Sequence, residues 1–381
     1  MLDYSENESV TRVRAELREL VAARIPEGFL GAFTDDPEDF ALTEAFSREL
    51  GRRHALAMSW PTAYGGAGAG PLEQAAVREE MWAAHEPRGA QYMGVNWVGP
   101  VIMLYGTEEQ KRRHLPPIAA GEVVWCQGFS EPGAGSDLPA LRTRATKVEG
   151  GWSITGQKVW TSYAQMAQWC FLLARTGAQD DRKAGITVFL VEMDQPGIEV
   201  RPIPSIMGPH HLNEVYLDQV VVPDSAVLGE IGGGWSIVAD VLGFERIGIA
   251  RYARTEKLLR EVRDHLSEGE WSALPESLRE RWAAALVRAR QARLMAYRLL
   301  EQQTPSALDA AAYRIAVTTL DQEGSEVLME ILSARALGAT SDSEHFEREV
   351  EDNWRYSLAA TVASGTLEVN KQTIAKSLGG R

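Results

Sequence analysis

Residues 127–137 read Gln-Gly-Phe-Ser-Glu-Pro-Gly-Ala-Gly-Ser-Asp and follow a short apolar run that is typical of a β-strand. Three consecutive small residues, 133–135, leave main-chain N–H groups open to a bound group, and Ser130 and Ser136 add two hydroxyls. Such a loop can bind a phosphate or a polar ring atom. The alternative is an ordinary β-turn, and this stretch alone does not decide between them.

A second stretch follows shortly after the first. Residues 156–162 read Gly-Gln-Lys-Val-Trp-Thr-Ser, with Trp160 two positions before Ser162. On a strand, this spacing places a flat apolar face near a polar hydroxyl. The alternative is a turn followed by a tryptophan of the core.

Both stretches lie in a segment, residues 119–230, whose apolar runs have the length of strands. The runs are rich in Val, Ile, Thr, Trp and Phe, as in Trp169–Leu173, Ile186–Val191 and Val215–Leu217. Glycines and prolines separate them. This pattern predicts an antiparallel β domain.

The flanking segments, residues 1–118 and 231–381, have helical periodicity instead. Val10, Val13, Leu17 and Leu20 share one helix face, and Pro26 bounds that helix. Residues 107–110 form a capping box, in which the Thr and Gln side chains satisfy opposite free amides of a helix start. The C-terminal segment predicts a bundle of long helices.

Composition excludes several classes of protein. The 381 residues suffice for two or three domains, and Cys126 and Cys170 are too few for a disulfide scaffold. The net charge of −14 argues against binding to nucleic acid or to an anionic membrane surface. We find no signal peptide and no apolar run near the roughly 20 residues of a membrane helix, so we expect a cytoplasmic protein.

Other chemistry-bearing motifs are missing from the sequence. There is no phosphate-binding P-loop and no nucleophile elbow of a serine hydrolase. The glycines of residues 65–70 do not follow a strand, which favours a flexible turn. His210 and His211 lack metal-ligand spacing, so we interpret them as a surface pair and expect no metal site.

Together, and in this α-β-α order, the two stretches resemble the acyl-CoA dehydrogenase family over nearly the whole chain. Further matches are Tyr64–Gly68, Gly106–Lys111, Asn213–Val215, Val222–Pro223, Gly233–Trp235 and Gly365–Val369. The resemblance implies an α+β fold. Its parts are an N-terminal helical domain (1–118), a middle antiparallel β domain (119–230) and a C-terminal four-helix bundle (231–381).

The resemblance also implies FAD as cofactor and an acyl thioester of coenzyme A or a carrier protein as substrate. In this family a carboxylate removes the α-proton while the flavin N5 takes hydride from the β-carbon. By similarity, the flavin and its pyrophosphate are lined by Gln127, Phe129, Ser130 and Ser136, and the ring is flanked by Trp160 and Ser162. The resemblance further assigns Thr366 and Glu368 to the cofactor and Arg246 and Ser136 to the substrate.

The catalytic base departs from the common family pattern. In many members it precedes the terminal Gly-Thr, where this chain has Ser364, and a serine cannot deprotonate a thioester at neutral pH. Its main-chain N–H could still bind the thioester oxygen. A minority of the family carries a glutamate on an earlier helix, here Glu245 beside Arg246. The alternative for Glu245 is a surface glutamate paired with an arginine.

Two family motifs that serve a neighbouring subunit's flavin are absent. Residues 266–279 lack R-x-x-F-G, and residues 333–339 lack Gly-Gly-x-Gly. This combination is similar to one subunit type of heteromeric acyl-CoA dehydrogenases. We expect a homo-oligomer or a heterotetramer with a related subunit, and an acceptor such as an electron-transfer flavoprotein. The alternatives are a non-catalytic partner subunit and a flavin monooxygenase on the same fold.

Local charge reconciles an acidic chain with two polyanionic ligands. We expect the helix that carries Glu245 to continue through a basic stretch, which comprises Arg246, Arg251, Arg254, Lys257, Arg260 and Arg263. Glu256 and Glu261 offset this charge only in part.

Overall fold

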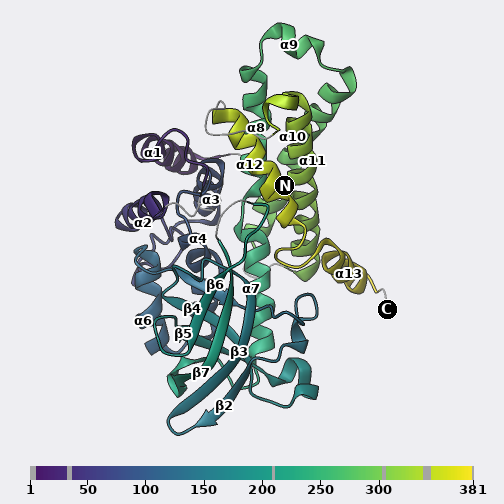
Figure 1. Ribbon diagram of the computed structural model, residues 1–381. Helices are drawn as coiled ribbons and strands as arrows, with labels where there is room; N and C mark the ends of the chain where they lie inside the picture. Colours follow the sequence, from purple (N-terminus) through teal and green to yellow (C-terminus); the bar gives the residue numbers. More distant parts are fainter. Residues whose placement is uncertain (1–5, 32–36, 208–210, 303–305, 338–344, 380–381) are drawn as a thin grey trace. The chain divides into compact units, whose positions relative to one another are not determined.

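The computed structural model describes residues 6–31, 37–207, 211–302, 306–337 and 345–379 (Figure 1). The helices are α1 (Glu8–Arg24), α2 (Pro37–Arg52), α3 (Pro71–Ala83), α4 (Gln91–Met93), α5 (Gly99–Tyr105), α6 (Glu108–Ala119), α7 (Gly234–Gly248), α8 (Arg251–His265), α9 (Glu268–Ala273), α10 (Glu276–Leu300), α11 (Ala307–Leu332), α12 (His345–Ala360) and α13 (Leu367–Ser377). The strands are β1 (Trp125–Gly128), β2 (Arg144–Val148), β3 (Gly151–Ser162), β4 (Trp169–Arg175), β5 (Ile186–Glu192), β6 (Ile198–Pro202), β7 (Leu212–Pro223) and β8 (Val227–Leu228).

The chain forms two compact units. The helical unit comprises α1, α3 and α8–α13, and the sheet unit comprises α2, α4–α6, all the strands and α7 up to Glu245. Each unit therefore draws on more than one stretch of sequence. The α+β class is confirmed, while the division at residues 118 and 230 stays a prediction.

Local sequence signals explain where several helices begin and what they bury. The predicted apolar face of α1 is buried, and the helix ends just before Pro26. The predicted capping box at α6 is present: Gln110 N donates to Thr107 Oγ1, and Thr107 N donates to Gln110 Oε1. These two bonds satisfy amides that a helix start otherwise leaves without partners.

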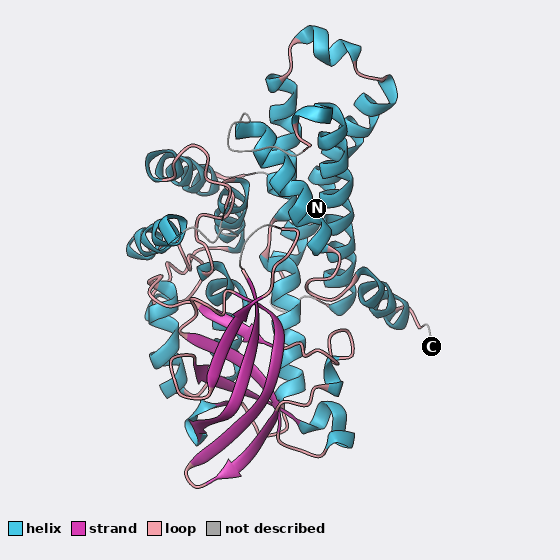
Figure 2. Ribbon diagram, in the orientation of Figure 1, coloured by secondary structure: helices cyan, strands magenta, loops and turns pink. Residues whose placement is uncertain are grey.

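The strands, magenta in Figure 2, form one sheet. Their order is β6-β7-β3-β2-β4-β5-β8, and β1 pairs with β4. Most neighbours are antiparallel, as predicted, but β1 pairs with β4 in parallel, and β2 meets β4 in parallel at one residue pair. The predicted antiparallel β domain is therefore a mixed sheet, with parallel pairing where β4 meets β1 and β2. Alternating side chains identify a strand but not the direction of its partner.

The helical unit is a bundle in which α11 packs against α8, α10, α12 and α13. The predicted continuous basic helix is wrong in two ways. The helix with Glu245 ends at Gly248, and α8 begins at Arg251. The basic residues of α8 also have acidic partners, which are Asp321 for Arg251, Asp352 for Arg254, Glu349 for Lys257, Glu256 for Arg260 and Glu268 for Arg263.

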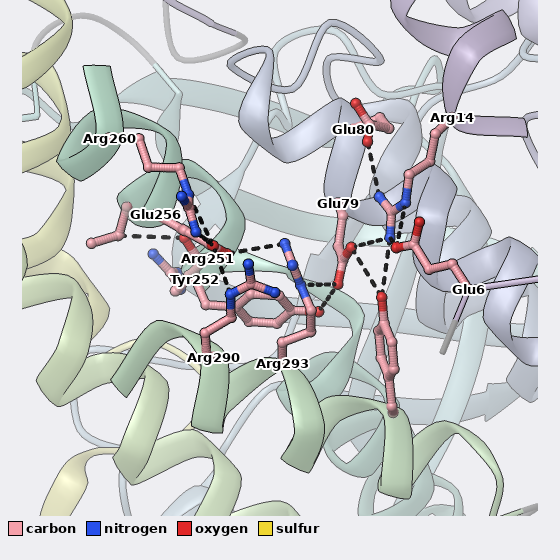
Figure 3. A network of polar contacts seen from close by, with 12 residues as sticks. Glu6, Arg14, Glu79, Glu80, Arg251, Tyr252, Glu256, Arg260, Arg290 and Arg293 are labelled. Atoms are coloured by element: carbon pink, nitrogen blue, oxygen red, sulfur yellow. Dashed lines mark hydrogen bonds and ion pairs between the residues drawn. The ribbon is translucent and has the colours of Figure 1, made fainter. Parts of the chain in front are cut away.

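A network of buried charges links α1, α3, α8 and α10 within the helical unit (Figure 3). At its centre Glu79, 2% exposed, accepts hydrogen bonds from Arg14 at 2.5 Å and from the Tyr252 hydroxyl at 2.6 Å. Arg293 lies 3.2 Å from the same carboxylate and bridges to Glu256 at 3.0 Å. Each buried charge thus has an opposite partner, which is the condition for tolerating it.

Three sequence expectations concern histidines, metals and membranes. The surface assignment of His211 is wrong because this residue is 4% exposed, and His210 lies outside the described residues. Among the described residues, no cluster of His, Cys, Asp and Glu side chains is arranged to hold a metal ion. None of the described helices is long and apolar enough to span a bilayer.

Candidate functional site

The loop after β1 folds into a tight turn whose outer residues are exposed. Glu131 and Ala134 exchange two main-chain hydrogen bonds of 3.0 Å each. Nothing lies within 4 Å of the Cβ position at either Gly133 or Gly135, and Ser136 is exposed as well. The outer face of this loop is therefore open to an incoming group, as predicted for a phosphate-binding loop.

Glu131 fixes the base of this loop. Its carboxylate accepts hydrogen bonds from the main-chain N–H groups of Arg142 at 2.6 Å and Thr143 at 2.8 Å, and from Lys158 Nζ at 2.8 Å. Lys158 is fully buried and also donates to the carbonyl of Phe129 at 3.1 Å. Despite its own desolvation, the pKa of Glu131 lies below its usual value, because Lys158 and the amide donors stabilise the charged form.

Trp160 stands out from β3 at an irregularity in the strand. The register between β3 and β7 shifts between Lys158 and Thr161, and Trp160 adopts a φ of 60° in the left-handed region. Its side chain is 60% exposed. A bulky residue in this conformation costs about 1–3 kcal/mol, and such strain clusters at functional sites. The exposed ring is available to a flat aromatic ligand, as expected for a residue that flanks a flavin.

The remaining predicted residues of the sheet unit lie on or beside the same strands. Phe129 packs against Phe171 with a ring separation of 5.9 Å, and the Ser130 carbonyl accepts from Val159 N at 2.9 Å. Gln127 is in β1, and Ser162 ends β3. The sheet therefore joins the two sequence stretches at the Ser130–Val159 bond, one residue before Trp160.

Several buried polar atoms in this region have no hydrogen-bond partner among the described residues. They include Gln127 Nε2, beside the loop, and Thr161 Oγ1, next to Trp160. A buried polar group without a partner is costly, so each is a candidate for a bond to a bound polar group. Together with the open loop and the exposed indole, these groups fit a cofactor that has both a polar aromatic ring and phosphates.

Glu245 lies three residues before the end of α7 and is half-buried. Its neighbours Phe244 and Ile247 are apolar, and Ile247 is 7% exposed. The sheet unit ends at Glu245, and the helical unit begins at Arg246. The base that the sequence predicts therefore sits on a helix, and not on a loop.

The predicted C-terminal residues lie in a turn that precedes α13 in the helical unit. Ser364 and Gly365 have φ values of 56° and 83°, so two consecutive residues are left-handed. Thr366 then caps α13 by accepting from Val369 N at 3.2 Å, and Glu368 lies in the first helical turn. Asn370 Nδ2 donates to the Gly365 carbonyl at 2.9 Å and holds the turn in place.

Arg246 is brought next to this turn. A Cβ at Gly365 would lie 3.7 Å from a terminal guanidinium nitrogen of Arg246. The residue assigned to the substrate thus neighbours the residue after Ser364. The structure groups Arg246, Ser364, Thr366 and Glu368 in the helical unit, and the other predicted residues in the sheet unit.

Sequence motifs assign no role to Lys158, Glu131 or Arg175. Lys158 and Glu131 are 27 positions apart, and Arg175 is the last residue of β4. One sequence signal points to the two basic residues: each is a charged residue within or beside an apolar run. A charged residue that is buried in this way needs a partner of opposite charge or a hydrogen-bond acceptor. The sequence did not indicate which acid that partner would be.

The whole chain matches one protein family. Matches to the acyl-CoA dehydrogenase N-terminal, middle and C-terminal domains cover residues 7–122, 126–220 and 232–379. The chain belongs to the acyl-CoA dehydrogenase family. It is 36% identical over 359 residues to the acyl-CoA dehydrogenase FadE34 of Mycobacterium tuberculosis, which covers 93% of this chain. The chain spans about half (47%) of the length of that relative.

Solved structures of similar sequence share the fold throughout. The chain superposes on a structure described as the Tcur3481-Tcur3483 steroid ACAD with a TM-score of 0.88 and 30% identity, covering 100% of both chains. It superposes equally well, with a TM-score of 0.88 and 31% identity, on the ChsE4-ChsE5 complex from Mycobacterium tuberculosis, covering 100% of this chain and 99% of that one.

Proposed function

We propose that the protein catalyses the FAD-dependent α,β-dehydrogenation of an acyl thioester, with Glu245 as the base. The observation that carries this proposal is the pairing of an open, anchored loop with a strained and exposed tryptophan on the adjoining strand. Membership of the family supports the same reaction class.

The residues of the sheet unit would hold the cofactor. The open loop would bind through its main-chain amides and Ser136, Trp160 would lie against the ring, and Gln127 and Thr161 would bond to polar atoms. Thr366 and Glu368 are assigned to the cofactor by resemblance. FAD, when bound, supplies an acceptor for the hydride that leaves the β-carbon of the substrate.

The proton chemistry belongs to the chain itself. Glu245 would take the α-proton, and apolar neighbours on α7 suit a carboxylate that must accept a proton near neutral pH. The main-chain N–H of Ser364 would donate to the thioester carbonyl and stabilise the enolate charge that develops there. Arg246 would bind an anionic part of the substrate.

The related structures support two finer proposals. One of them is described as a steroid ACAD, and both are described by paired chains. We therefore propose a bulky, ring-containing acyl group as substrate and a heteromeric assembly with a second related chain. An electron-transfer flavoprotein would reoxidise the cofactor.

The test is the visible spectrum of the protein, purified with its co-expressed partner chain. We expect a yellow protein that is bleached by an acyl-CoA substrate without oxygen. Glu245→Gln should keep the colour and lose the bleaching. The matched control is Asp240→Asn on the same helix, whose carboxylate accepts a 2.7 Å hydrogen bond from Tyr105, and it should still bleach.

Other outcomes would favour the alternatives. Full bleaching of Glu245→Gln would show that Glu245 is not the base. Colourless protein would favour a non-catalytic partner subunit. Oxygen consumption with a hydroxylated product would favour a monooxygenase.

A further inference from the structure

Both flanks of the open loop are anchored by buried basic side chains. The first anchor is Lys158 of β3, which is fully buried and binds both the Glu131 carboxylate and the Phe129 carbonyl. It therefore fixes the chain immediately before and at the start of the turn. Replacing it would leave a carboxylate that keeps only the amide donors of Arg142 and Thr143.

The second anchor is Arg175 of β4, which is 1% exposed. Its guanidinium makes four hydrogen bonds, and all of them end on main-chain carbonyls. It donates to Pro139 at 2.8 Å, Leu141 at 3.0 Å, Arg182 at 3.0 Å and Ala178 at 3.2 Å. Arg175 thus ties the end of the loop to the β4–β5 connection.

Residues 132–137 between the two anchors carry little packing of their own. Pro132, Gly133, Gly135, Ser136 and Asp137 are exposed, and Ala134 is held by its two bonds to Glu131. Asp137 forms a surface ion pair with Arg182, whose carbonyl is bound by Arg175. Residues 132–137 therefore form a short exposed segment whose two ends are held by the hydrogen bonds of Lys158 and Arg175.

We propose that Lys158 and Arg175 are positioning residues that hold residues 132–137 ready to bind the anionic part of FAD. This inference rests on the proposed function. Neither side chain would touch the cofactor. Their contribution is to remove, before binding, the conformational freedom that an exposed glycine-rich segment would otherwise lose on binding.

The test measures FAD affinity and apoprotein stability separately. We expect Lys158→Met and Arg175→Met to raise the dissociation constant of FAD about tenfold or more, which corresponds to about 1.4 kcal/mol. Affinity is measured by visible absorbance at a temperature where circular dichroism shows each apoprotein folded. Because Lys158→Met leaves Glu131 without its cation, the double variant Glu131→Gln/Lys158→Met is a second test that removes both charges.

The conservative variant and the controls separate geometry from charge. Arg175→Lys should not restore affinity, because an ammonium cannot reach the four carbonyls that surround the planar guanidinium. The matched controls are Lys147→Met and Arg144→Met, two exposed basic residues of β2, and both should bind FAD within about twofold of wild type.

Each result bears on one proposal or on both. If Lys158→Met and Arg175→Met lower the melting temperature but bind FAD as tightly as wild type, the two residues stabilise the fold only. That result would overturn this inference and leave the proposed function standing. Full rescue by Arg175→Lys would overturn the geometric role of Arg175. A wild-type protein that binds no FAD would overturn the proposed function, and this inference with it.

Discussion

The guanidinium of Arg314 on α11 donates a 2.9 Å hydrogen bond to the main-chain carbonyl of Ala363. The same nitrogen donates to Ala360 at 2.8 Å, and Arg314 is 2% exposed. One buried side chain therefore holds the end of α12 and the residue before Ser364. Because the peptide between Ala363 and Ser364 is planar, holding the Ala363 carbonyl also fixes the direction of the Ser364 N–H.

Replacing Arg314 should loosen the turn. We expect Arg314→Met to lower the free energy of unfolding by about 2–3 kcal/mol, since two buried carbonyls lose a charged donor. Turnover should fall further than the apparent substrate affinity, because the thioester oxygen would lose an oriented donor. Urea unfolding and steady-state kinetics measure the two effects. Arg298→Met, at an exposed position of α10, is the control and should change neither.

Substitutions at Ser364 should separate the side chain from the main chain. Ser364→Gly should keep activity and stability to within about 1 kcal/mol, because glycine adopts the left-handed φ without strain. Ser364→Val should destabilise by about 1–2 kcal/mol because a β-branched residue resists this φ. Thermal unfolding and turnover are the measurements. Loss of activity in Ser364→Gly with a normal melting temperature would show that the hydroxyl has a role of its own.

Replacing the strained Trp160 should affect apoprotein stability and FAD affinity in opposite directions. Trp160→Gly should leave apoprotein stability unchanged or raise it by about 1 kcal/mol, because glycine relieves the left-handed φ and the lost ring was exposed. The same variant should bind FAD more weakly, and Trp160→Phe should bind it better than Trp160→Gly. Calorimetry and flavin titration are the measurements. A large loss of stability in Trp160→Gly would mean that the indole serves the fold.

His114 should make the protein sensitive to mild acid. Burial, and secondarily the nearby Arg113, lower the pKa of His114 from 6.5 to about 4. The unfolded chain therefore binds a proton that the folded chain rejects, so stability falls as pH drops from about 6.5 to about 4 and is unaffected above this window. The loss attributable to His114 should reach about 2 kcal/mol at pH 5.

The variant His114→Phe tests this assignment. The ring packs edge-on against Trp125 at 5.2 Å and Trp169 at 4.6 Å, contacts that phenylalanine can keep. The fall in unfolding free energy between pH 7 and pH 5 should be smaller in the variant than in wild type. Identical pH dependence in the two proteins would assign the effect to other groups.

The buried network around Glu79 should be sensitive to the loss of one charge. We expect Glu79→Gln to destabilise by about 3 kcal/mol, because Arg14, Arg293 and the Tyr252 hydroxyl would lose the buried charged acceptor that they share, while Arg14 keeps Glu80 and Arg293 keeps Glu256. Glu330→Gln, which breaks an exposed pair with Arg281, should cost at most about 0.5 kcal/mol. Chemical unfolding of both variants measures the difference. Equal effects would mean that Glu80 and Glu256 alone are enough to stabilise the two arginines.

Elements governed by near neighbours in the sequence could be predicted from it. The apolar face of α1, the capping box of α6 and the exposed loop at residues 132–137 all depend on residues within a few positions of one another. Trp160 was found by its spacing from Ser162, although its left-handed conformation was not.

Features that depend on distant partners could not be predicted. The short apolar run of β1 does not show the direction of its partner, and only the neighbouring β4 makes the pairing parallel. The basic residues of α8 are expected from sequence to attract anionic ligands, but the acids that pair with Arg251 and Arg254 come from α11 and α12, 70 and 98 positions away. The relation between Lys158 and Glu131 was missed for the same reason. Charge pairing is a property of packing, and local composition does not specify it.

The break between α7 and α8 at residues 249–250 has an evolutionary consequence. Arg251 and Arg254 are buried and each is paired with an acid of another helix, so α8 tolerates few changes at these positions. The helical hydrogen bonds of α7 end at Gly248 and do not continue into α8. Changes in the length of α7 would leave the paired arginines of α8 in place, so the helix that carries the proposed base can vary in evolution more freely than the helix that follows it.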